Sequence, residues 1–303
     1  MLLKINEITA KTILTKSGLP GADWVVNSYG GCQLGCTYCY AAQIARWHHP
    51  DEEWGSYLDV KTNAPELLKN ELNKLSRRDA RPGVSTHQNK IKSSKDFGFI
   101  FFSSVTDPYT GLEAKYHITR QCLQVFVDFG YEGAIGIQTK SPLVTQDIDI
   151  LKKLKKVQVG FTVTTLDDQV ARFLEPLAPP ISARIEALKQ LHDNGVSTYA
   201  FVGPILPHFV NNKKAINELL DALQHAGVSE VWFEHLNQSS KIKTRLYEYL
   251  QKNSPELIPD FESADTAEYR DNLNKIILDS MKNRPMTLAL GKVIFHHDLP
   301  KKR

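Results

Sequence analysis

The chain has 303 residues, of which 42% are hydrophobic and 23% charged, and its formal net charge is +3. These proportions are ordinary for a globular protein, and so small a net charge excludes a strong overall field that would draw the whole chain onto nucleic acid. No apolar stretch approaches the roughly 20 residues that cross a bilayer, and residues 1–7 lack the apolar run of a signal peptide. We therefore expect no membrane partner and a cytoplasmic, reducing location.

Apolar runs alternate along the chain with segments of helical periodicity. The runs predict six strands, at residues 24–27, 97–102, 134–138, 157–163, 198–205 and 230–234. The periodic segments predict helices at residues 37–47, 65–77, 118–126, 144–154, 182–195 and 216–227. Because the strands are apolar and alternate with helices, the pattern favours an α/β fold with a parallel sheet wrapped by helices. Six units are too few for a closed eightfold barrel, so we expect an open, partial barrel.

Two segments lie outside this alternation. Residues 241–303 contain two predicted helices and a last apolar run at 286–295, and we predict a C-terminal elaboration packed against a core of residues 1–240. Residues 77–95 contain six basic residues and a single acid, with proline, glycine and serine, which is typical of a loop. This basic insertion is either an arm that contacts phosphates or a solvated loop without a partner.

Three of the four cysteines, Cys32, Cys36 and Cys39, lie in the loop of residues 30–40. Thiolates this close repel one another unless a metal takes up their charge. Their spacing lets one loop bind three corners of an iron–sulfur cubane. The fourth iron is then open to a small molecule that bears amino and carboxylate groups.

Other uses of these cysteines remain open. A structural zinc site would need a fourth ligand such as His48 or His49, and a ferredoxin-like cluster would need Cys122, about eighty residues further on. A disulfide framework would leave one of the three cysteines unpaired. The spacing favours the cubane over these alternatives.

Polar and small residues lie at the carboxyl ends of the predicted strands, where parallel α/β folds cluster their binding groups. Together they suit an ammonium group, a carboxylate, ribose hydroxyls and an adenine. The candidates are Ser104, Thr106 and Asp107 after the second strand, Lys140 after the third, Thr162 and Thr164 at the fourth, and Gly203 and Ile205 at the fifth.

Several segments resemble, in order, one branch of a known superfamily. They are residues 26–32, 36–41, 105–109, 139–141, 164–167, 174–176 and 202–207. These segments are similar to the spore photoproduct lyase-like branch, also called DNA repair photolyase-like, of the radical S-adenosylmethionine (SAM) enzymes. The likeness extends over residues 20–240.

The resemblance implies a partial (β/α)6 barrel of radical SAM type, a 4Fe–4S cluster and SAM. It implies that the three loop cysteines bind the cluster, that Lys140 meets the SAM carboxylate and that Thr162 or Thr164 meets the ribose. A one-electron reductant of flavodoxin or ferredoxin type would reduce the cluster, and SAM would break into methionine and a 5′-deoxyadenosyl radical. In such enzymes the cofactor carries the hard chemistry, and the barrel orients and shields it.

The chain differs from the family pattern at Ser104. Spore photoproduct lyases proper carry a cysteine there that returns a hydrogen atom to the product radical, and a serine O–H bond is too strong to do so. The remaining thiol, Cys122, lies on a predicted helix face and is expected in the core. The sequence therefore argues against thymine-dimer repair by that mechanism, but it keeps nucleic acid as a candidate substrate.

Two further functional classes stay open. One is an iron–sulfur binding or electron-transfer module that does not turn over SAM. The other is a nucleic-acid-binding protein whose cluster is structural. The sequence determines neither the substrate, nor whether SAM is consumed or regenerated, nor the oligomeric state.

Overall fold

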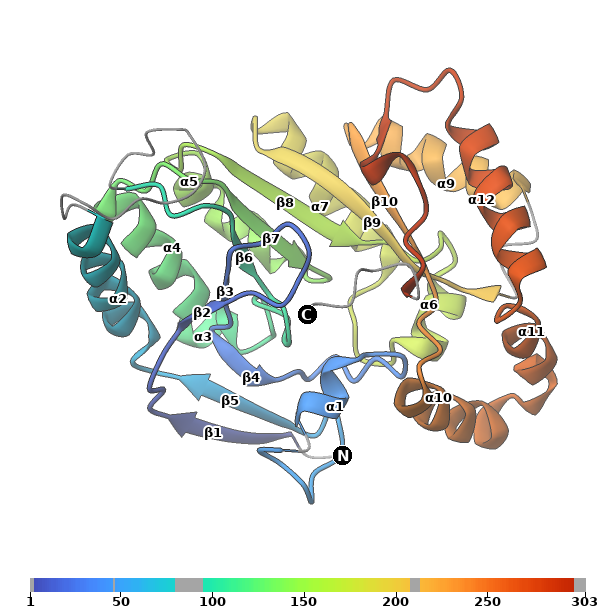
Figure 1. Cartoon of the computed structure of the whole chain (residues 1–303), viewed down its shortest axis with the longest axis horizontal. Helices are drawn as coiled ribbons and strands as arrows, with labels where there is room; N and C mark the ends of the chain where they lie inside the picture. Colours follow the sequence, from blue (N-terminus) through green and yellow to red (C-terminus); the bar gives the residue numbers. More distant parts are fainter. Residues whose placement is uncertain (1–2, 46, 80–94, 208–212, 297–303) are drawn as a thin grey trace.

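The computed structural model describes residues 3–45, 47–79, 95–207 and 213–296. Its largest element is an eight-stranded sheet with the order β11-β10-β9-β8-β7-β6-β3-β2 (Figure 1). The strands are β2 (Leu14–Lys16), β3 (Trp24–Val26), β6 (Ile100–Phe102), β7 (Ile135–Thr139), β8 (Val157–Thr162), β9 (Ser197–Ile205), β10 (Glu230–His235) and β11 (Thr287–Leu288).

Neighbouring strands of this sheet pair in parallel, except that β2 pairs antiparallel with β3. Six of the parallel strands, β3 and β6 to β10, correspond to the six predicted strands. The expected α/β fold, with the parallel sheet of a partial barrel, is therefore confirmed. Because all of these strands run in one direction, their carboxyl ends meet at one edge of the sheet.

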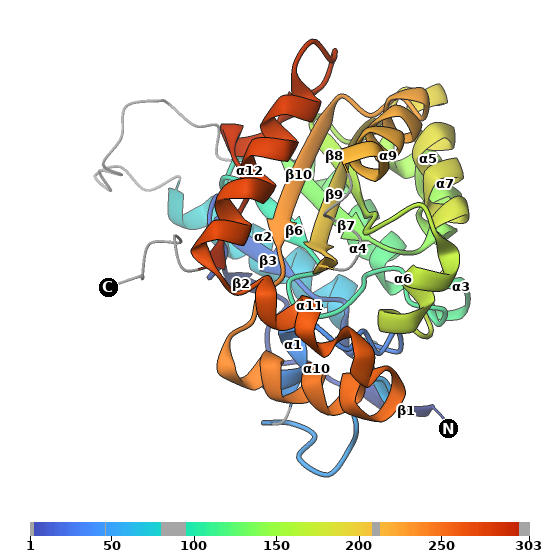
Figure 2. The same cartoon turned by 90° about the vertical axis from the view of Figure 1, so that its right-hand side faces the viewer.

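Helices accompany this sheet, and most of them pack around it (Figures 1 and 2). They are α1 (Ala41–Ala45), α2 (Ala64–Asp79), α3 (Glu113–Tyr116), α4 (Ile118–Phe129), η1 (Pro142–Asp147), α5 (Ile148–Leu151), α6 (Asp168–Leu174), α7 (Ile181–Asp193) and α9 (Lys213–His225). The main hydrophobic core joins sheet residues such as Ile137 and Val159 to helix residues such as Phe126, Leu188 and Leu220, and all five are fully buried. The core therefore lies between the sheet and its helices.

A second, three-stranded sheet was not expected from the sequence. It contains β1 (Lys4–Ile8), β5 (Tyr57–Lys61) and β4 (Tyr29–Gly31), with β5 in the middle. β4 has two glycines in three residues and β5 includes Asp59, so neither strand shows a continuous apolar run. Gly31 has a φ of 72°, and a Cβ there would lie 2.6 Å from the Tyr57 ring, so this position requires glycine. The second sheet leads the chain directly into the cysteine loop.

The part of the chain after residue 240 has more helices than predicted. It contains α10 (Ser240–Asn253), η2 (Pro255–Leu257), α11 (Ile258–Ser263), α12 (Ala267–Met281) and η3 (Ala289–Gly291). The apolar run at 286–295 is not one strand, because Leu290 and Gly291 have positive φ values of 60° and 64° and break it. β11 pairs with β10, and a bridge joins Glu234 to Ile294. The division at residue 240 stays a prediction.

Most of the predicted basic insertion, residues 80–94, lies outside the described residues. The first residue of the insertion, Arg77, lies in α2. Its last residue, Lys95, is again among the described residues. Within the described part of the chain, no helix has the length and apolar character that crossing a membrane requires.

Candidate functional site

The cysteine loop runs from β4 to α1 and contains two consecutive turns. In the first turn, the amide of Gly35 donates to the Cys32 carbonyl. In the second, the amide of Cys39 donates to the Cys36 carbonyl. Because this second turn is not helical, the helix predicted from residue 37 begins only at Ala41. The turns bring the three thiols close enough to influence one another.

The three thiols are largely withdrawn from water. Cys32 and Cys36 are 8% and 6% exposed, and Cys39 is half-buried. Burial raises the pKa of each thiol, that of Cys36 to about 12, and mutual repulsion raises the pKa of Cys32 and Cys36 further. Buried thiols of this kind ionise when a metal replaces the proton. Their chemistry and their shared loop fit a thiolate-bound metal centre.

The described residues contain no three His, Cys, Asp or Glu side chains placed around one point, as the ligands of a single ion would be. The cysteines of a cubane bind different irons and do not share such a point. The fourth ligands that the alternatives need lie elsewhere. His49 Nε2 is 2.7 Å from Asp59 Oδ2, and Cys122 is fully buried in the main core, as expected.

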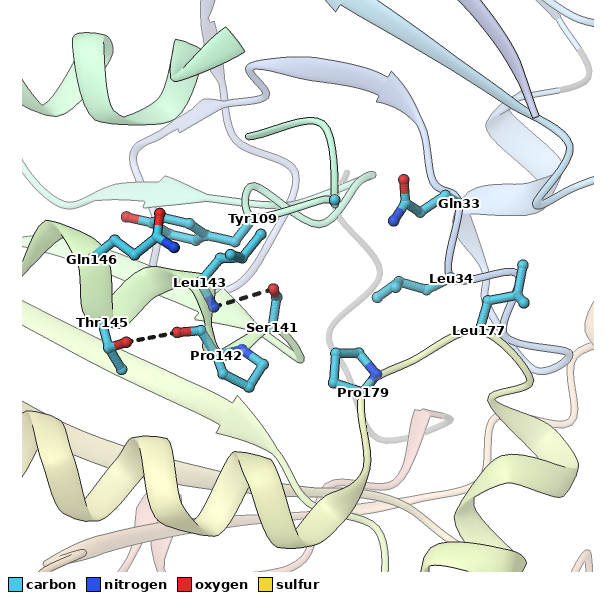
Figure 3. Close-up of a pocket in the computed structure, with 11 residues that line it drawn as sticks. Gln33, Leu34, Tyr109, Ser141, Pro142, Leu143, Thr145, Gln146, Leu177 and Pro179 are labelled. Carbon is cyan, nitrogen blue, oxygen red and sulfur yellow. Dashed lines mark hydrogen bonds between the residues drawn. The ribbon is translucent and has the colours of Figure 1, made fainter. Parts of the chain in front are cut away.

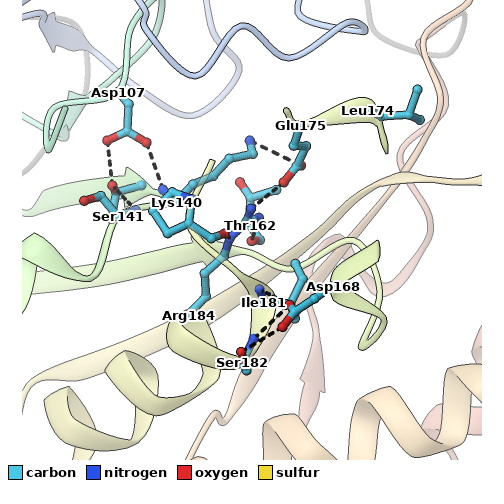
Figure 4. A network of polar contacts seen from close by, with 12 residues as sticks. Asp107, Lys140, Ser141, Thr162, Asp168, Leu174, Glu175, Ile181, Ser182 and Arg184 are labelled. Atoms are coloured by element: carbon cyan, nitrogen blue, oxygen red, sulfur yellow. Dashed lines mark hydrogen bonds and ion pairs between the residues drawn. The ribbon is translucent and has the colours of Figure 1, made fainter. Parts of the chain in front are cut away.

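Lys140 follows β7 and brings a cation to the loop (Figure 4). Its Nζ lies 3.9 Å from Glu175 Oε1 and 5.8 Å from the centre of the Tyr38 ring, and its side chain is 15% exposed. Burial lowers the pKa of Lys140, but its electrostatic interactions with Cys36 and Glu175 outweigh burial, so the pKa is raised. Lys140 is therefore a charged ammonium beside the loop thiols.

Glu175 and Arg184 complete a buried network around Lys140 that the sequence did not predict (Figure 4). Both side chains are 1% exposed. Arg184 donates to Glu175 Oε2 at 2.5 Å, and it also donates to the carbonyls of Thr162 and Pro179, both at 2.9 Å. The Tyr38 hydroxyl donates to the other oxygen of Glu175. The network thus connects the cysteine loop, the end of β8 and α7.

One signal of this network is present in the sequence. Arg184 lies four and seven residues before Leu188 and Leu191, so it falls on the same buried face of α7. A cation on the apolar face of a helix requires a buried partner. The local pattern does not say which residue that partner is, and the structure identifies it as Glu175.

The site residues predicted after the second of the six predicted strands, which is β6, connect neighbouring segments of the chain. The carboxylate of Asp107 accepts hydrogen bonds from Thr139 Oγ1 at 2.6 Å and from the Lys140 amide at 2.8 Å. Thr106 Oγ1 donates to the Gly31 carbonyl at 2.5 Å. Asp107 therefore fixes the turn that carries Lys140, and Thr106 fixes the entry to the cysteine loop.

Ser104 lies close to the same loop. Its hydroxyl oxygen accepts a hydrogen bond from Asn27 Nδ2 at 2.9 Å, and its carbonyl accepts one from the Tyr40 hydroxyl. The position thus links the end of β3 to the residue that follows Cys39. Its role as a contact for a ligand stays a prediction.

The residues predicted at the fourth and fifth strands have different surroundings. Thr162 Oγ1 accepts a hydrogen bond from Gln138 Nε2 at 3.2 Å, whereas Thr164 Oγ1 is buried and has no hydrogen-bond partner among the described residues. A Cβ on Gly203 would lie 2.8 Å from Glu234 Cβ, so only glycine fits there, and Ile205 is 3% exposed. An unsatisfied buried hydroxyl costs about 1–3 kcal/mol, which a ligand can offset by bonding to it.

A cleft of 460 Å³ adjoins the tip of the cysteine loop (Figure 3). Gln33 and Leu34 form one wall, and Leu177 and Pro179 form another. A third wall contains Ser141, Pro142, Leu143, Thr145 and Gln146. Leu34 also packs with Cys32 and Cys36. The cleft therefore adjoins the side of the cysteine loop that carries Leu34. Its described lining contains none of the residues predicted to bind SAM.

About two thirds of the chain matches a known family. The model of the Radical SAM superfamily matches residues 26–223, which are most of the chain. The chain belongs to the radical SAM superfamily. Its cofactors are therefore a 4Fe–4S cluster and SAM, and it is an enzyme that needs an electron donor.

Individual proteins also resemble this chain. An uncharacterized protein of Methanocaldococcus jannaschii is 33% identical over 254 residues, which are 84% of this chain and 85% of that protein. The radical SAM Nalpha-GlyT isomerase of Pseudomonas phage M6 is 26% identical over 204 residues, which are 67% of this chain and 37% of that protein. The latter alignment thus covers a smaller part of a longer protein.

Solved structures of spore photoproduct lyase share the fold. The lyase complexed with dinucleoside spore photoproduct has a TM-score of 0.67 and 15% identity, and the alignment covers 94% of this chain and 81% of that one. A double mutant of the lyase with bound AdoMet and the same dinucleoside has a TM-score of 0.65. The structural part of the predicted resemblance is therefore confirmed.

Proposed function

We propose that this enzyme cleaves SAM reductively at a cluster held by Cys32, Cys36 and Cys39. The observation that carries the proposal is the group of three thiols on one loop, two buried and one half-buried, with the ammonium of Lys140 beside it. When both cofactors are bound, the reduced cluster supplies the electron that divides SAM into methionine and a 5′-deoxyadenosyl radical. The thiolates anchor the cluster, and the buried loop limits access of water to it.

The residues around the loop are proposed to orient SAM. Lys140 pairs with its carboxylate, and the unsatisfied hydroxyl of Thr164, or else Thr162, bonds to the ribose. Gly203 and Ile205, near the end of β9, are the proposed contacts for the adenine. The remaining predicted contacts are Ser104, Thr106 and Asp107. Asp107 acts at least through the turn that positions Lys140.

The test is anaerobic reconstitution with iron and sulfide, followed by dithionite and SAM. We expect about four irons per chain, as a cubane requires, and release of 5′-deoxyadenosine. The triple variant in which all three loop cysteines become alanine should hold no cluster, and Cys122→Ala is the matched control that should keep it. A wild-type protein that binds stoichiometric zinc without iron–sulfur absorbance, or that holds a cluster but releases no 5′-deoxyadenosine, would overturn the proposal.

We further propose that the substrate is a nucleic acid. The proposal is supported by the dinucleoside bound to spore photoproduct lyase and by the basic insertion at residues 77–95. The positions to be neutralised together are Arg77, Arg78, Arg81, Lys90, Lys92 and Lys95. The salt dependence of binding should then flatten by about 0.7–0.9 log units per lost phosphate contact.

A fluorescent single-stranded or duplex oligonucleotide serves as the probe, titrated at several salt concentrations. Formation of 5′-deoxyadenosine without nucleic acid is the control and should survive the neutralisation. If the wild type and the neutralised variant bind DNA and RNA equally, or neither binds, the insertion is a solvated loop and the substrate is of another class.

The remaining proposals concern the setting of the enzyme. A flavodoxin or ferredoxin supplies the electron, and the reducing cytoplasm protects the cluster from oxygen. Residues 1–240 form the catalytic core, and residues 241–303 form an elaboration that packs on it.

A further inference from the structure

Arg245 reaches the cysteine loop from the C-terminal part of the chain. It lies on α10, and its guanidinium donates a hydrogen bond to the carbonyl of Cys36, 209 residues away in the sequence. Figure 2 shows α10 beside α1, the helix that follows the loop. The superfamily match ends at residue 223, so this contact comes from beyond the matched core.

A small hydrophobic core anchors the helix that carries Arg245. The next residue, Leu246, is fully buried and packs with Leu174 at the end of α6. One turn further along α10, the Tyr249 hydroxyl donates to the Phe173 carbonyl at 2.7 Å. α10 is therefore fixed to α6, and Arg245 is held at the loop by the packing of its own helix.

The same part of the loop is also held by α6 itself. The amide of Thr37 donates to the Leu174 carbonyl at 2.9 Å, and its hydroxyl donates to the same carbonyl at 3.3 Å. The peptide between Cys36 and Thr37 is thus bonded to α10 through its oxygen and to α6 through its nitrogen. This peptide sets the relative placement of Cys36 and Cys39.

The guanidinium of Arg245 also brings a positive charge to the cysteine loop, because its hydrogen bond to the Cys36 carbonyl holds it there. A cubane held by three thiolates carries a net negative charge, and reduction adds one more. A fixed cation nearby stabilises the reduced form more than the oxidised form and therefore raises the reduction potential.

We propose that Arg245 is a positioning residue of the cluster site, through which the C-terminal elaboration sets the reduction potential of the cluster. The hydrogen bond to Cys36 places the guanidinium, and its charge makes the cluster easier to reduce. The inference rests on the proposed function, because it requires the three loop cysteines to hold the cluster.

The experiment compares three variants after anaerobic reconstitution, with iron and sulfide content and the midpoint potential of the cluster as readouts. Arg245→Gln removes the charge and keeps a donor, and Arg245→Lys keeps the charge. Lys252→Gln removes an exposed charge from the last turn of the same helix and is the matched control. We expect a full cluster with a more negative midpoint in R245Q, and midpoints close to that of the wild type in R245K and K252Q.

Other outcomes overturn the proposal. A full cluster with an unchanged midpoint in R245Q, an equal shift in K252Q, or no rescue by R245K would show that the charge is not used. If both Arg245 variants lose the cluster, the residue has only a structural role in the loop. If the wild type takes up a cluster and the variants show the expected midpoint shifts, but the wild type does not cleave SAM, only the proposed function is contradicted.

Discussion

In the described part of the chain, Glu113 and Glu175 are buried in contrasting surroundings. Glu113 is 4% exposed, and its carboxylate accepts hydrogen bonds from the Tyr29 hydroxyl and from the amides of Thr119 and Arg120, at 3.1 and 3.0 Å. Among the described residues it makes no ion pair. Glu175 is equally buried but contacts Arg184 and lies near Lys140.

The difference separates a scaffold region from a site region. Burial raises the pKa of Glu113 to about 7, against the opposing hydrogen bonds, so neutral donors at the start of α4 do not fully compensate for the lost water. Beside the cysteine loop, two cations and one carboxylate are instead held together out of water. A buried group of charges with an excess cation is suited to a charged ligand such as the SAM carboxylate.

Loss of the carboxylate at Glu175 should have the largest effect on the free energy of unfolding. Glu175→Gln leaves Arg184 buried without its counter-charge, and breaking a buried pair in this way costs about 3–5 kcal/mol. Urea unfolding at pH 5 under anaerobic, reducing conditions measures the free energy of unfolding. Glu113→Gln is the matched control, because Glu113 is already protonated at that pH, and it should cost less than about 1 kcal/mol. Equal losses in the two variants would show that the surroundings of the two glutamates do not differ in this way.

The second largest effect should be the contribution of Glu113 to the pH dependence of the free energy of unfolding. Its pKa is raised from 4.5 to about 7, so the native state holds the proton more tightly than the unfolded chain does. The stability that this proton contributes is complete below pH 4.5 and is lost as the pH rises through 7, a change of about 3 kcal/mol.

The measurement is the difference in unfolding free energy between wild type and Glu113→Gln from pH 4.5 to 8. This difference removes the opposite contribution of buried His235, whose pKa burial lowers to about 4 and whose contribution is lost as the pH falls below 6.5. The wild type should lose stability relative to the variant as the pH rises. A flat difference would show that Glu113 stays ionised throughout.

Removal of the ammonium at Lys140 should weaken SAM binding without unfolding the protein. Lys140→Met keeps most of the side-chain volume and leaves the pair of Glu175 and Arg184 in place. Loss of one charge-assisted contact should lower SAM affinity by about 1.5–3 kcal/mol. Equilibrium dialysis on the reconstituted protein measures the affinity, and Lys155→Met, which changes an exposed lysine, is the control. Unchanged affinity in Lys140→Met would remove Lys140 from the SAM site.

The smallest effect is expected from two buried threonines. Thr164 lies in the site region and Thr119 in the scaffold region. Thr164 Oγ1 has no partner among the described residues, whereas Thr119 Oγ1 donates to the Pro108 carbonyl at 2.6 Å. Thr164→Val should leave the stability of the cofactor-free protein unchanged or slightly higher, and Thr119→Val should cost about 1 kcal/mol. Thermal unfolding without cofactors tests this order. A larger loss in Thr164→Val would show that its hydroxyl is already bonded in the folded protein.

The sequence by itself determined the series of six strands and the cysteine loop. Both signals are local, because a strand buried on both faces is apolar throughout, and three thiols within eight residues must share one loop. The parallel order of the strands also placed Lys140 and Thr162 at a common edge of the sheet. These features depend on neighbours in the chain or on the direction of the strands.

Only the tertiary structure decided which distant residues meet at that loop. Arg184 is visible in the sequence as a cation on an apolar face, but its partner depends on how α7 packs against the segment after α6. Arg245 lies 209 residues from Cys36, and β4 pairs with β5 across the cysteine loop. Such contacts join residues through packing, and a local hydrophobic pattern specifies that a face is buried without specifying what buries it.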